Sequence, residues 1–389
     1  MGCVCAAGPD LPGSLQGIFA GHRRAAVPQR FSTSHAVRYP VFEIPDSFLE
    51  CNGLQIHKEY SLTVKYALHA SAAALNQAGW SEEDLSKLTV GVCMGTTVGS
   101  TLNSEEFYRE YLQGGVPDME PVHMFLDGNP AEAVARATGF SGPCQTVVNA
   151  CSSGTDAIGI GAEWIESGLC DVVLAGGTDE LCRTTYNGFA SLMIMDAEPC
   201  RPFDKSRAGL NLGEGAGVMI LESSSLRNKG KKKILGSVLG YGSACDAYHL
   251  TAPHPRGSGL RRAMSQALEL SRADTSEVAF VNAHGTGTMD NDRVEATVLN
   301  EILPDTPFLS TKGYTGHTLG AAGGIEAVFT LSCLNMGRIP ASAGFSQCDP
   351  ALDMAPVKKN TFIAGQVAVS QSLAFGGNNG VLVLQGCRY

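Results

Sequence analysis

The stretch Asn149-Ala150-Cys151-Ser152-Ser153-Gly154-Thr155-Asp156-Ala157 joins two different sequence patterns. The residues before it, Gln145-Thr146-Val147-Val148, are typical of a strand, and the small residues from 154 to 162 predict a closely packed helix. A sharp strand-to-helix turn presents one side chain at the helix N-terminus, where backbone N–H groups and the helix dipole favour negative charge. We therefore predict that Cys151 is a nucleophile whose thiolate is stabilised.

Strand and helix patterns alternate along most of the chain, which predicts an α/β fold. Near-continuous apolar runs suit strands that are covered on both faces. Four such runs lie at 88–94, 171–177, 278–284 and 367–370, with helical patterns between them, for example at 61–78 and 259–271.

The chain also reads as two related halves, predicted at 1–226 and 227–389. In the second half, Phe308-Leu309-Ser310-Thr311 leads through a Gly-His-Thr turn to a helix at 321–337, as 145–148 leads through Cys151 to its helix. Each half closes with a probable hairpin arm, at 217–221 and 380–384. The charged run 227–233 between the halves is predicted to be a solvated turn.

Composition excludes several classes of function. The net charge of −10 argues against general binding to nucleic acid or to an anionic membrane. The 13 cysteines are an odd number without paired metal spacing, which indicates a reducing, cytoplasmic compartment and no disulfide framework. We find no run of about 18 apolar residues, so no transmembrane helix is expected.

Two histidine motifs and a glycine loop accompany the cysteine. His284 follows a predicted strand within Asn282-Ala283-His284-Gly285-Thr286-Gly287-Thr288, and His317 lies at a second strand-to-helix turn, five residues after Lys312. The loop Phe375-Gly376-Gly377-Asn378-Asn379-Gly380 offers backbone N–H groups for an oxyanion hole. All three segments follow strands, and open α/β sheets place their sites at the carboxyl ends of strands.

In combination these segments resemble the β-ketoacyl synthases of the thiolase superfamily, in particular the Cys-His-His class that elongates acyl chains on acyl carrier protein. The resemblance runs from about residue 3 to residue 384. It also includes Arg201-Pro202-Phe203-Asp204, Gly213-Glu214-Gly215-Ala216-Gly217 and Asp246-Ala247-Tyr248-His249-Leu250-Thr251-Ala252-Pro253.

The resemblance implies a decarboxylating condensation. Cys151 would accept an acyl group, and His284 and His317 would donate N–H groups to the enolate oxygen of a malonyl thioester. The backbone of Phe375 would contribute to the oxyanion hole and its ring would control access. Lys312 would orient the site, and Glu326 would have a structural or supporting role. Thr286 and Thr288 would bind the phosphopantetheine arm.

The resemblance also implies a five-layered α-β-α-β-α thiolase-like sandwich and a dimer, either a homodimer or a heterodimer with a related subunit, with 145–148 near the interface. The expected partners are acyl carrier protein and malonyl and acyl thioesters. No metal and no tightly bound cofactor are expected, because the carrier delivers the phosphopantetheine. We expect the carrier to bind a basic patch drawn from His22-Arg23-Arg24, Arg256 and Arg261-Arg262.

The sequence departs from the family pattern in three places. We expect the first strand to be missing or reduced to Met1-Gly2, which would leave the sheet one strand short. Arg207-Ala208-Gly209-Leu210 stands where Arg-Asp-Gly-Phe is common, and Leu373 replaces a frequent phenylalanine. These changes predict a reshaped pocket and leave open whether the pathway is fatty-acid synthesis or a specialised polyketide or polyene route.

Two alternatives remain open on sequence alone. A chain-length-factor-like partner subunit would share the fold, although such subunits typically lack the active cysteine. A papain-like cysteine hydrolase would need a Cys-His-Asn arrangement, which the two His-Gly motifs do not favour.

Overall fold

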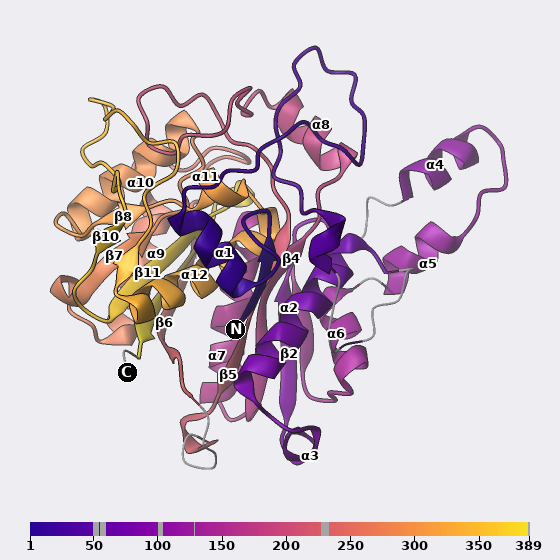
Figure 1. Cartoon of the computed structure of the whole chain (residues 1–389), viewed down its shortest axis with the longest axis horizontal. Coiled ribbons are helices and arrows are strands. Elements are labelled where there is room, and N and C mark those ends of the chain that lie inside the picture. Colours follow the sequence, from indigo (N-terminus) through magenta and orange to yellow (C-terminus); the bar gives the residue numbers. More distant parts are fainter. Residues whose placement is uncertain (50–53, 55–59, 100–103, 128, 227–232, 388–389) are drawn as a thin grey trace.

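Among the residues that the structure describes, two five-stranded β-sheets alternate with three layers of helices, and β9 and β10 form a separate two-stranded sheet (Figure 1). The computed structural model describes residues 1–49, 54, 60–99, 104–127, 129–226 and 233–387. Helices α7 and α12 lie between the two sheets, α2 covers the outer face of the first sheet, and α9 covers the outer face of the second. The predicted α-β-α-β-α sandwich is therefore confirmed.

The strands are β1 Gly2–Cys5, β2 Val90–Gly95, β3 Cys144–Val147, β4 Val172–Asp179, β5 Gly215–Glu222, β6 Gly236–Cys245, β7 Val278–Asn282, β8 Phe308–Leu309, β9 Arg338–Ile339, β10 Thr361–Phe362, β11 Val367–Leu373 and β12 Asn378–Gly386. The α-helices are α1 Leu11–Phe19, α2 Leu62–Ala78, α3 Glu82–Leu85, α4 Glu105–Leu112, α5 Glu120–Asp127, α6 Pro130–Thr138, α7 Ser153–Glu166, α8 Arg183–Ser191, α9 Ser258–Ser271, α10 Met289–Ile302, α11 Lys312–Thr315 and α12 Ala322–Met336. Every strand and helix predicted above is present, within a few residues of its expected bounds.

The two sheets share one topology. The first has the order β1-β5-β4-β2-β3 and the second the order β6-β12-β11-β7-β8. If the strands of each sheet are numbered along the chain, both orders become 1-5-4-2-3. In both sheets strand 5 pairs antiparallel with strands 1 and 4, and the other neighbouring strands are parallel. This agreement supports the prediction of two related halves at 1–226 and 227–389. The predicted turn at 227–233 lies, except for residue 233, outside the described residues.

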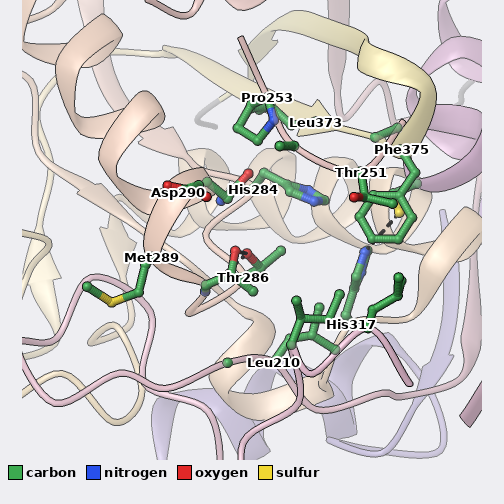
Figure 2. A pocket seen from close by; sticks show the side chains of 18 of the residues that line it. Leu210, Thr251, Pro253, His284, Thr286, Met289, Asp290, His317, Leu373 and Phe375 are labelled. Atoms are coloured by element: carbon green, nitrogen blue, oxygen red, sulfur yellow. Dashed lines mark hydrogen bonds between the residues drawn. The ribbon is translucent and has the colours of Figure 1, made fainter. Parts of the chain in front are cut away.

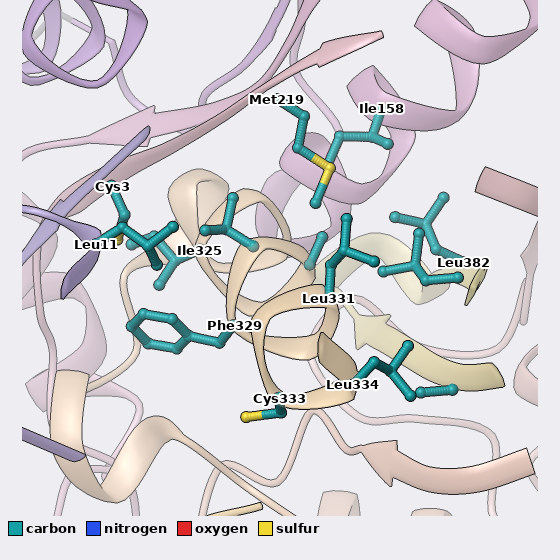
Figure 3. Close-up of a cluster of buried hydrophobic side chains, with 14 of the residues drawn as sticks. Cys3, Leu11, Ile158, Met219, Ile325, Phe329, Leu331, Cys333, Leu334 and Leu382 are labelled. Carbon is teal, nitrogen blue, oxygen red and sulfur yellow. The ribbon is translucent and has the colours of Figure 1, made fainter. Parts of the chain in front are cut away.

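Helix α12 runs through the centre of the molecule and is apolar on nearly all sides. Its side chains point in several directions: toward Cys3 and Leu11, toward Met219 and Ile158, and toward Leu382 (Figure 3). A helix that is hydrophobic all round is typical of a buried core helix. Within the described residues, the stretch 319–336 has the length and hydropathy of a membrane span, which the sequence analysis did not find, and 89% of it is buried in the protein. The expectation of no transmembrane helix stays a prediction.

The expectation of a missing first strand is also wrong. Residues 2–5 form β1, which pairs antiparallel with β5 at the edge of the first sheet. All four residues are buried, and a Cβ at Gly2 would come within 1.9 Å of the Ala70 carbonyl oxygen on α2. The strand is hidden in the sequence because it is short and only one of its residues is β-branched: Gly2 fills the narrow space against α2, and Cys3 and Cys5 pack on the opposite face, toward α12.

Candidate active site

Cys151 lies in a single 3₁₀ turn, Ala150–Ser152, between β3 and the first residue of α7. Ala150 has a φ of 49°, in the left-handed region that residues with a Cβ rarely adopt, so the turn is strained. Asp156, one turn into α7, holds it by accepting hydrogen bonds from Asn149 Nδ2 at 2.9 Å and Ser152 Oγ at 2.8 Å. The predicted position of the cysteine at a helix N-terminus is thus observed.

Both predicted histidines lie beside the cysteine. His317 Nε2 is 3.0 Å from Cys151 Sγ, and the rings of His284 and His317 meet edge to face with centroids 5.0 Å apart. All three side chains are buried. The structure therefore brings together residues separated by up to 166 positions in the sequence.

Lys312 fixes the protonation pattern of His284. Its Nζ donates to His284 Nδ1 at 3.1 Å and to the His284 carbonyl oxygen at 2.7 Å, and it pairs with Glu326 Oε1. An ammonium group has no acceptor, so His284 Nδ1 must be the unprotonated nitrogen. His284 consequently carries its proton on Nε2. Burial, then the charge of Lys312, lowers the pKa of His284, which keeps the ring neutral.

The prediction of a thiolate stabilised at rest is not supported. Burial raises the pKa of the Cys151 thiol to about 12, although Lys312 and the backbone N–H groups of Phe375 and Cys151 oppose the rise. Burial and the charge of Lys312 also lower the pKa of His317. The helix N-terminus does not outweigh the loss of hydration, so the resting pair is a neutral thiol beside a neutral imidazole, and the thiol must lose its proton during the reaction.

Phe375 contributes both its backbone and its ring. Its N–H group, like that of Cys151, interacts with the Cys151 sulfur, so two donors converge at the nucleophile. Its half-buried ring stacks on Phe189 of α8, with centroids 5.4 Å apart and planes 15° apart. Gly376 and Gly377 follow with φ values of 84° and 83°, a conformation that requires glycine in practice.

Glu295, on α10, is a site residue that the sequence analysis missed. Its buried carboxylate accepts from the backbone N–H groups of His284 at 2.7 Å and Gly285 at 2.6 Å, and from Gln371 Nε2 at 2.7 Å. It therefore holds the loop that carries His284. A glutamate within a charged helical segment is usually solvated, and the sequence gives no signal that α10 turns this one inward.

A cavity of about 320 Å³ connects the site to the surface (Figure 2). Cys151, His284 and His317 lie at its inner end, while Thr286 and Thr288 line its wall, with hydroxyl oxygens 2.9 Å apart. Three positions that depart from the family pattern also line it: Ala208, Leu210 and Leu373. The departures are thus concentrated where a substrate would pass.

Several buried oxygens near His284 have no hydrogen-bond partner among the described residues: Asn282 Oδ1, Glu326 Oε2 and Gln371 Oε1. Such oxygens can accept from a water molecule or bind a hard cation. In the same described part of the chain, no group of three or more His, Cys, Asp or Glu side chains is arranged to bind a metal. The expectation that no metal is required stays a prediction.

The comparisons with known proteins place this site in a family. The model of the β-ketoacyl synthase N-terminal domain matches residues 49–226, and that of the C-terminal domain matches residues 235–346. Together they cover well over half of the chain. The chain therefore belongs to the β-ketoacyl synthase family.

Among the sequence relatives, a 3-oxoacyl-[acyl-carrier-protein] synthase 2 from Synechocystis is 32% identical over 404 residues, covering 99% of this chain and 96% of the relative. The mitochondrial 3-oxoacyl-[acyl-carrier-protein] synthase of Arabidopsis thaliana is 31% identical, and the match covers 91% of this chain and 81% of the relative. The family membership predicted from the sequence motifs is confirmed.

Solved structures agree in fold. The ishigamide ketosynthase/chain length factor superposes with a TM-score of 0.92 at 30% identity, covering 99% of this chain and 97% of that one. A β-ketoacyl synthase from Burkholderia phymatum superposes with a TM-score of 0.87 at 27% identity, covering 100% of this chain and 98% of that one. The papain-like alternative is incompatible with this family and fold.

Proposed function

We propose that the chain is an elongating 3-oxoacyl-[acyl carrier protein] synthase, an acyltransferase that condenses an acyl thioester with a malonyl thioester carried by acyl carrier protein. The observation that supports this most directly is the buried constellation in which His317 Nε2 lies 3.0 Å from Cys151 Sγ, with the neutral ring of His284 beside it. The following steps derive from the positions of these residues.

Acyl transfer begins with proton removal from the thiol. Because burial raises the pKa of Cys151 to about 12, the sulfur needs a base, and His317 Nε2 is at hydrogen-bond distance from it. The sulfur attacks the thioester carbon, and the carrier thiol leaves with the proton that His317 held. The backbone N–H groups of Cys151 and Phe375 stabilise the oxyanion of the tetrahedral intermediate.

Decarboxylation of the malonyl thioester places negative charge on its thioester oxygen. The Nε2–H of His284, set by the bond from Lys312 to Nδ1, donates to this oxygen. His317 Nδ1 has no hydrogen-bond partner among the described residues, so once Cys151 is acylated the ring can take the tautomer with its proton on Nε2 and supply a second N–H. Both rings are neutral imidazoles, so each can donate a hydrogen bond to the developing negative charge. An imidazolium could instead transfer its proton to the malonyl carboxylate. Carbon dioxide leaves, and the enolate carbon attacks the acyl group on Cys151.

Condensation ends when the new tetrahedral intermediate expels Cys151. The thiolate regains a proton, and the β-ketoacyl thioester leaves with the carrier. In this scheme no tightly bound cofactor takes part, because the phosphopantetheine arrives on the carrier and its arm passes Thr286 and Thr288, which line the cavity.

The proposed assembly is a dimer formed at the free edge of the first sheet. Strand β3 is the last strand of that sheet, and Cys144 and Gln145 on it, together with Val148, are exposed. The ishigamide structure and a ketosynthase from Xenorhabdus doucetiae, 28% identical with a TM-score of 0.80, are described with chain length factors. A heterodimer with a related subunit is therefore proposed beside a homodimer, in the cytoplasm.

Within such a dimer this chain is proposed to be the catalytic subunit and not the chain-length-factor-like partner. The partner subunit would not need an intact pocket, whereas here Cys151, both histidines and the Lys312–Glu326 pair are in contact.

The test uses two readouts. Iodoacetamide labelling followed by peptide mass spectrometry should modify Cys151, and Cys151→Ala should abolish condensation. Malonyl decarboxylation should require His284 and His317 in the Cys151→Ala background. If Cys151→Ala leaves condensation intact, the proposal is wrong.

A further inference from the structure

Large apolar side chains surround the mouth of the cavity. Met193 is 85% exposed, Leu250 79%, Met289 54% and Leu192 42%. We call these four residues the apolar collar. Leu192, Met193 and Met289 line the cavity itself, and Leu250 borders it because its carbonyl oxygen accepts from the N–H of Gly376. Figure 2 shows Met289 at the side of the cavity far from His317.

The backbone holds one member of the collar outward. Met193 has a φ of 57°, and the residue follows the C-cap of α8 with its N–H bonded to the Ala190 carbonyl oxygen. A left-handed methionine is strained by about 1 kcal/mol or more, and such strain concentrates at functional surfaces. The protein thus retains an exposed apolar side chain at a position that a glycine or an asparagine would occupy more easily.

Several charged groups near the mouth already have partners within the protein, in two ion pairs and in one hydrogen bond to a backbone carbonyl. Asp290 pairs with Arg293 at 2.6 Å, Arg261 bonds Glu301 Oε2 through Nε at 2.9 Å, and Arg262 donates to the Cys245 carbonyl oxygen. Arg256 is exposed. Paired surface charges offer little attraction to a partner, because each is already partly compensated.

Arg23 and Arg24, which belong to the expected basic patch, also have partners within the protein. Arg23 donates to the carbonyl oxygens of Gly313 at 2.7 Å and Cys200 at 2.5 Å, so it is a structural residue. Arg24 lies over the ring of Phe48, 5.3 Å from its centroid. Of the six residues expected to form the basic patch, Arg23 is therefore held by the backbone of the protein itself, while His22, Arg24 and Arg256 are exposed.

We propose that the apolar collar binds an apolar helix face of the carrier domain that delivers the thioester, and that apolar contact rather than charge supplies most of this docking affinity. The inference rests on the proposed function, since a thioester tethered to a carrier can reach Cys151 through this cavity only with the carrier body at its mouth. A protein interface has an apolar centre and a polar rim. The collar supplies that centre, and Arg256 and the Asp290–Arg293 pair lie in the rim.

The test measures carrier binding and turnover separately. Fluorescence polarisation with a labelled, malonyl-loaded acyl carrier protein gives the Kd, and condensation is followed with that carrier and with a free N-acetylcysteamine thioester. Leu250→Asp and Met193→Asp should each weaken carrier binding about tenfold, the effect of losing one well-packed apolar contact. Aspartate tolerates a positive φ better than methionine, so Met193→Asp should fold. Both variants should lower kcat/KM for the carrier substrate more than for the free thioester.

Two controls define the apolar character. Leu270→Asp makes the same change on the exposed face of α9, where Leu270 is 59% exposed, and should leave binding unchanged. Raising the salt concentration to about 0.5 M should alter the Kd less than twofold, because screening weakens ionic but not apolar contacts.

The proposal is overturned if wild-type protein does not bind the carrier, or if Arg256→Glu and added salt weaken binding while the collar variants do not. It is also overturned if collar variants dissociate a dimer in analytical ultracentrifugation, since the collar would then bind a second copy. If carrier binding depends on the apolar collar but no condensation occurs, the collar is supported as the docking site and the proposed function is refuted.

Discussion

Replacing Lys312 with methionine tests the arrangement that keeps both catalytic rings neutral. Lys312 is 1% exposed and makes three contacts: His284 Nδ1, the His284 carbonyl oxygen and Glu326 Oε1. The substitution leaves the Glu326 carboxylate buried without its cation. Breaking a buried pair in this way costs about 3–5 kcal/mol of the free energy of unfolding.

The same substitution frees the His284 proton to occupy either nitrogen. In the Nδ1–H form, Nε2 would face the enolate oxygen as an acceptor, and one donor to the developing charge would be lost. Losing one such donor lowers the rate about 10²–10³-fold. We therefore expect both lower stability and slower decarboxylation of a malonyl thioester, measured by urea unfolding and by carbon dioxide release.

The double variant Lys312→Met with Glu326→Leu separates the two effects. Replacing both members of a buried ion pair with apolar side chains is often neutral or stabilising, so the double variant should regain most of the lost stability. It should not regain decarboxylation, because His284 Nδ1 still lacks its donor. The reasoning is refuted if the free energy of unfolding of Lys312→Met lies within about 1 kcal/mol of the wild-type value. It is also refuted if the double variant recovers the wild-type rate of decarboxylation.

Three further outcomes follow from the structure. Because burial raises the pKa of Cys151 to about 12, the rate of its alkylation should rise with pH without a plateau from about pH 6 to 10, whereas a plateau in a stopped-flow pH series would show a resting thiolate. Gly323→Ala should lower the midpoint of urea unfolding strongly, because the new Cβ would lie 2.1 Å from Thr155 Oγ1, while Gly188→Ala, with no atom within 4 Å, should not. Asp156→Ala removes an acceptor from Asn149 Nδ2, from the Tyr241 hydroxyl and from Ser152 Oγ, which keeps the Asn149 carbonyl oxygen. It should cost about 1–3 kcal/mol of unfolding free energy and slow Cys151 acylation, measured by mass spectrometry, and unchanged acylation would show that Asp156 does not hold the turn.

The strands and helices at the centre of the two large sheets were predictable because they are strongly patterned, whereas α4, α5, α6 and α10 were not predicted. β4, β7 and β11 are near-continuous apolar runs, and α2 ends at a left-handed glycine, Gly79. β1 was not predictable. Its Gly2 suits a narrow space against α2 that exists only after the two elements pack, and its cysteines face α12.

The reactive residues were also predictable, since Cys151, His284, His317 and Lys312 each lie in a motif at the end of a strand. Their protonation was not. The sequence suggested a thiolate at a helix N-terminus, but burial of the whole constellation raises the pKa of the thiol and lowers those of both imidazoles. Glu295 was missed for a related reason, because only the packing of α10 determines that it faces inward.

The sequence alone predicted which residues react and which elements carry them, because motifs and hydrophobic periodicity are local properties of the chain. The tertiary structure decided how those residues are protonated, which carboxylates hold their loops and which side chains surround the mouth of the cavity. These depend on distances and burial between segments far apart in the sequence, such as the 166 residues that separate Cys151 from His317. Such quantities are set when the two sheets close around α7 and α12.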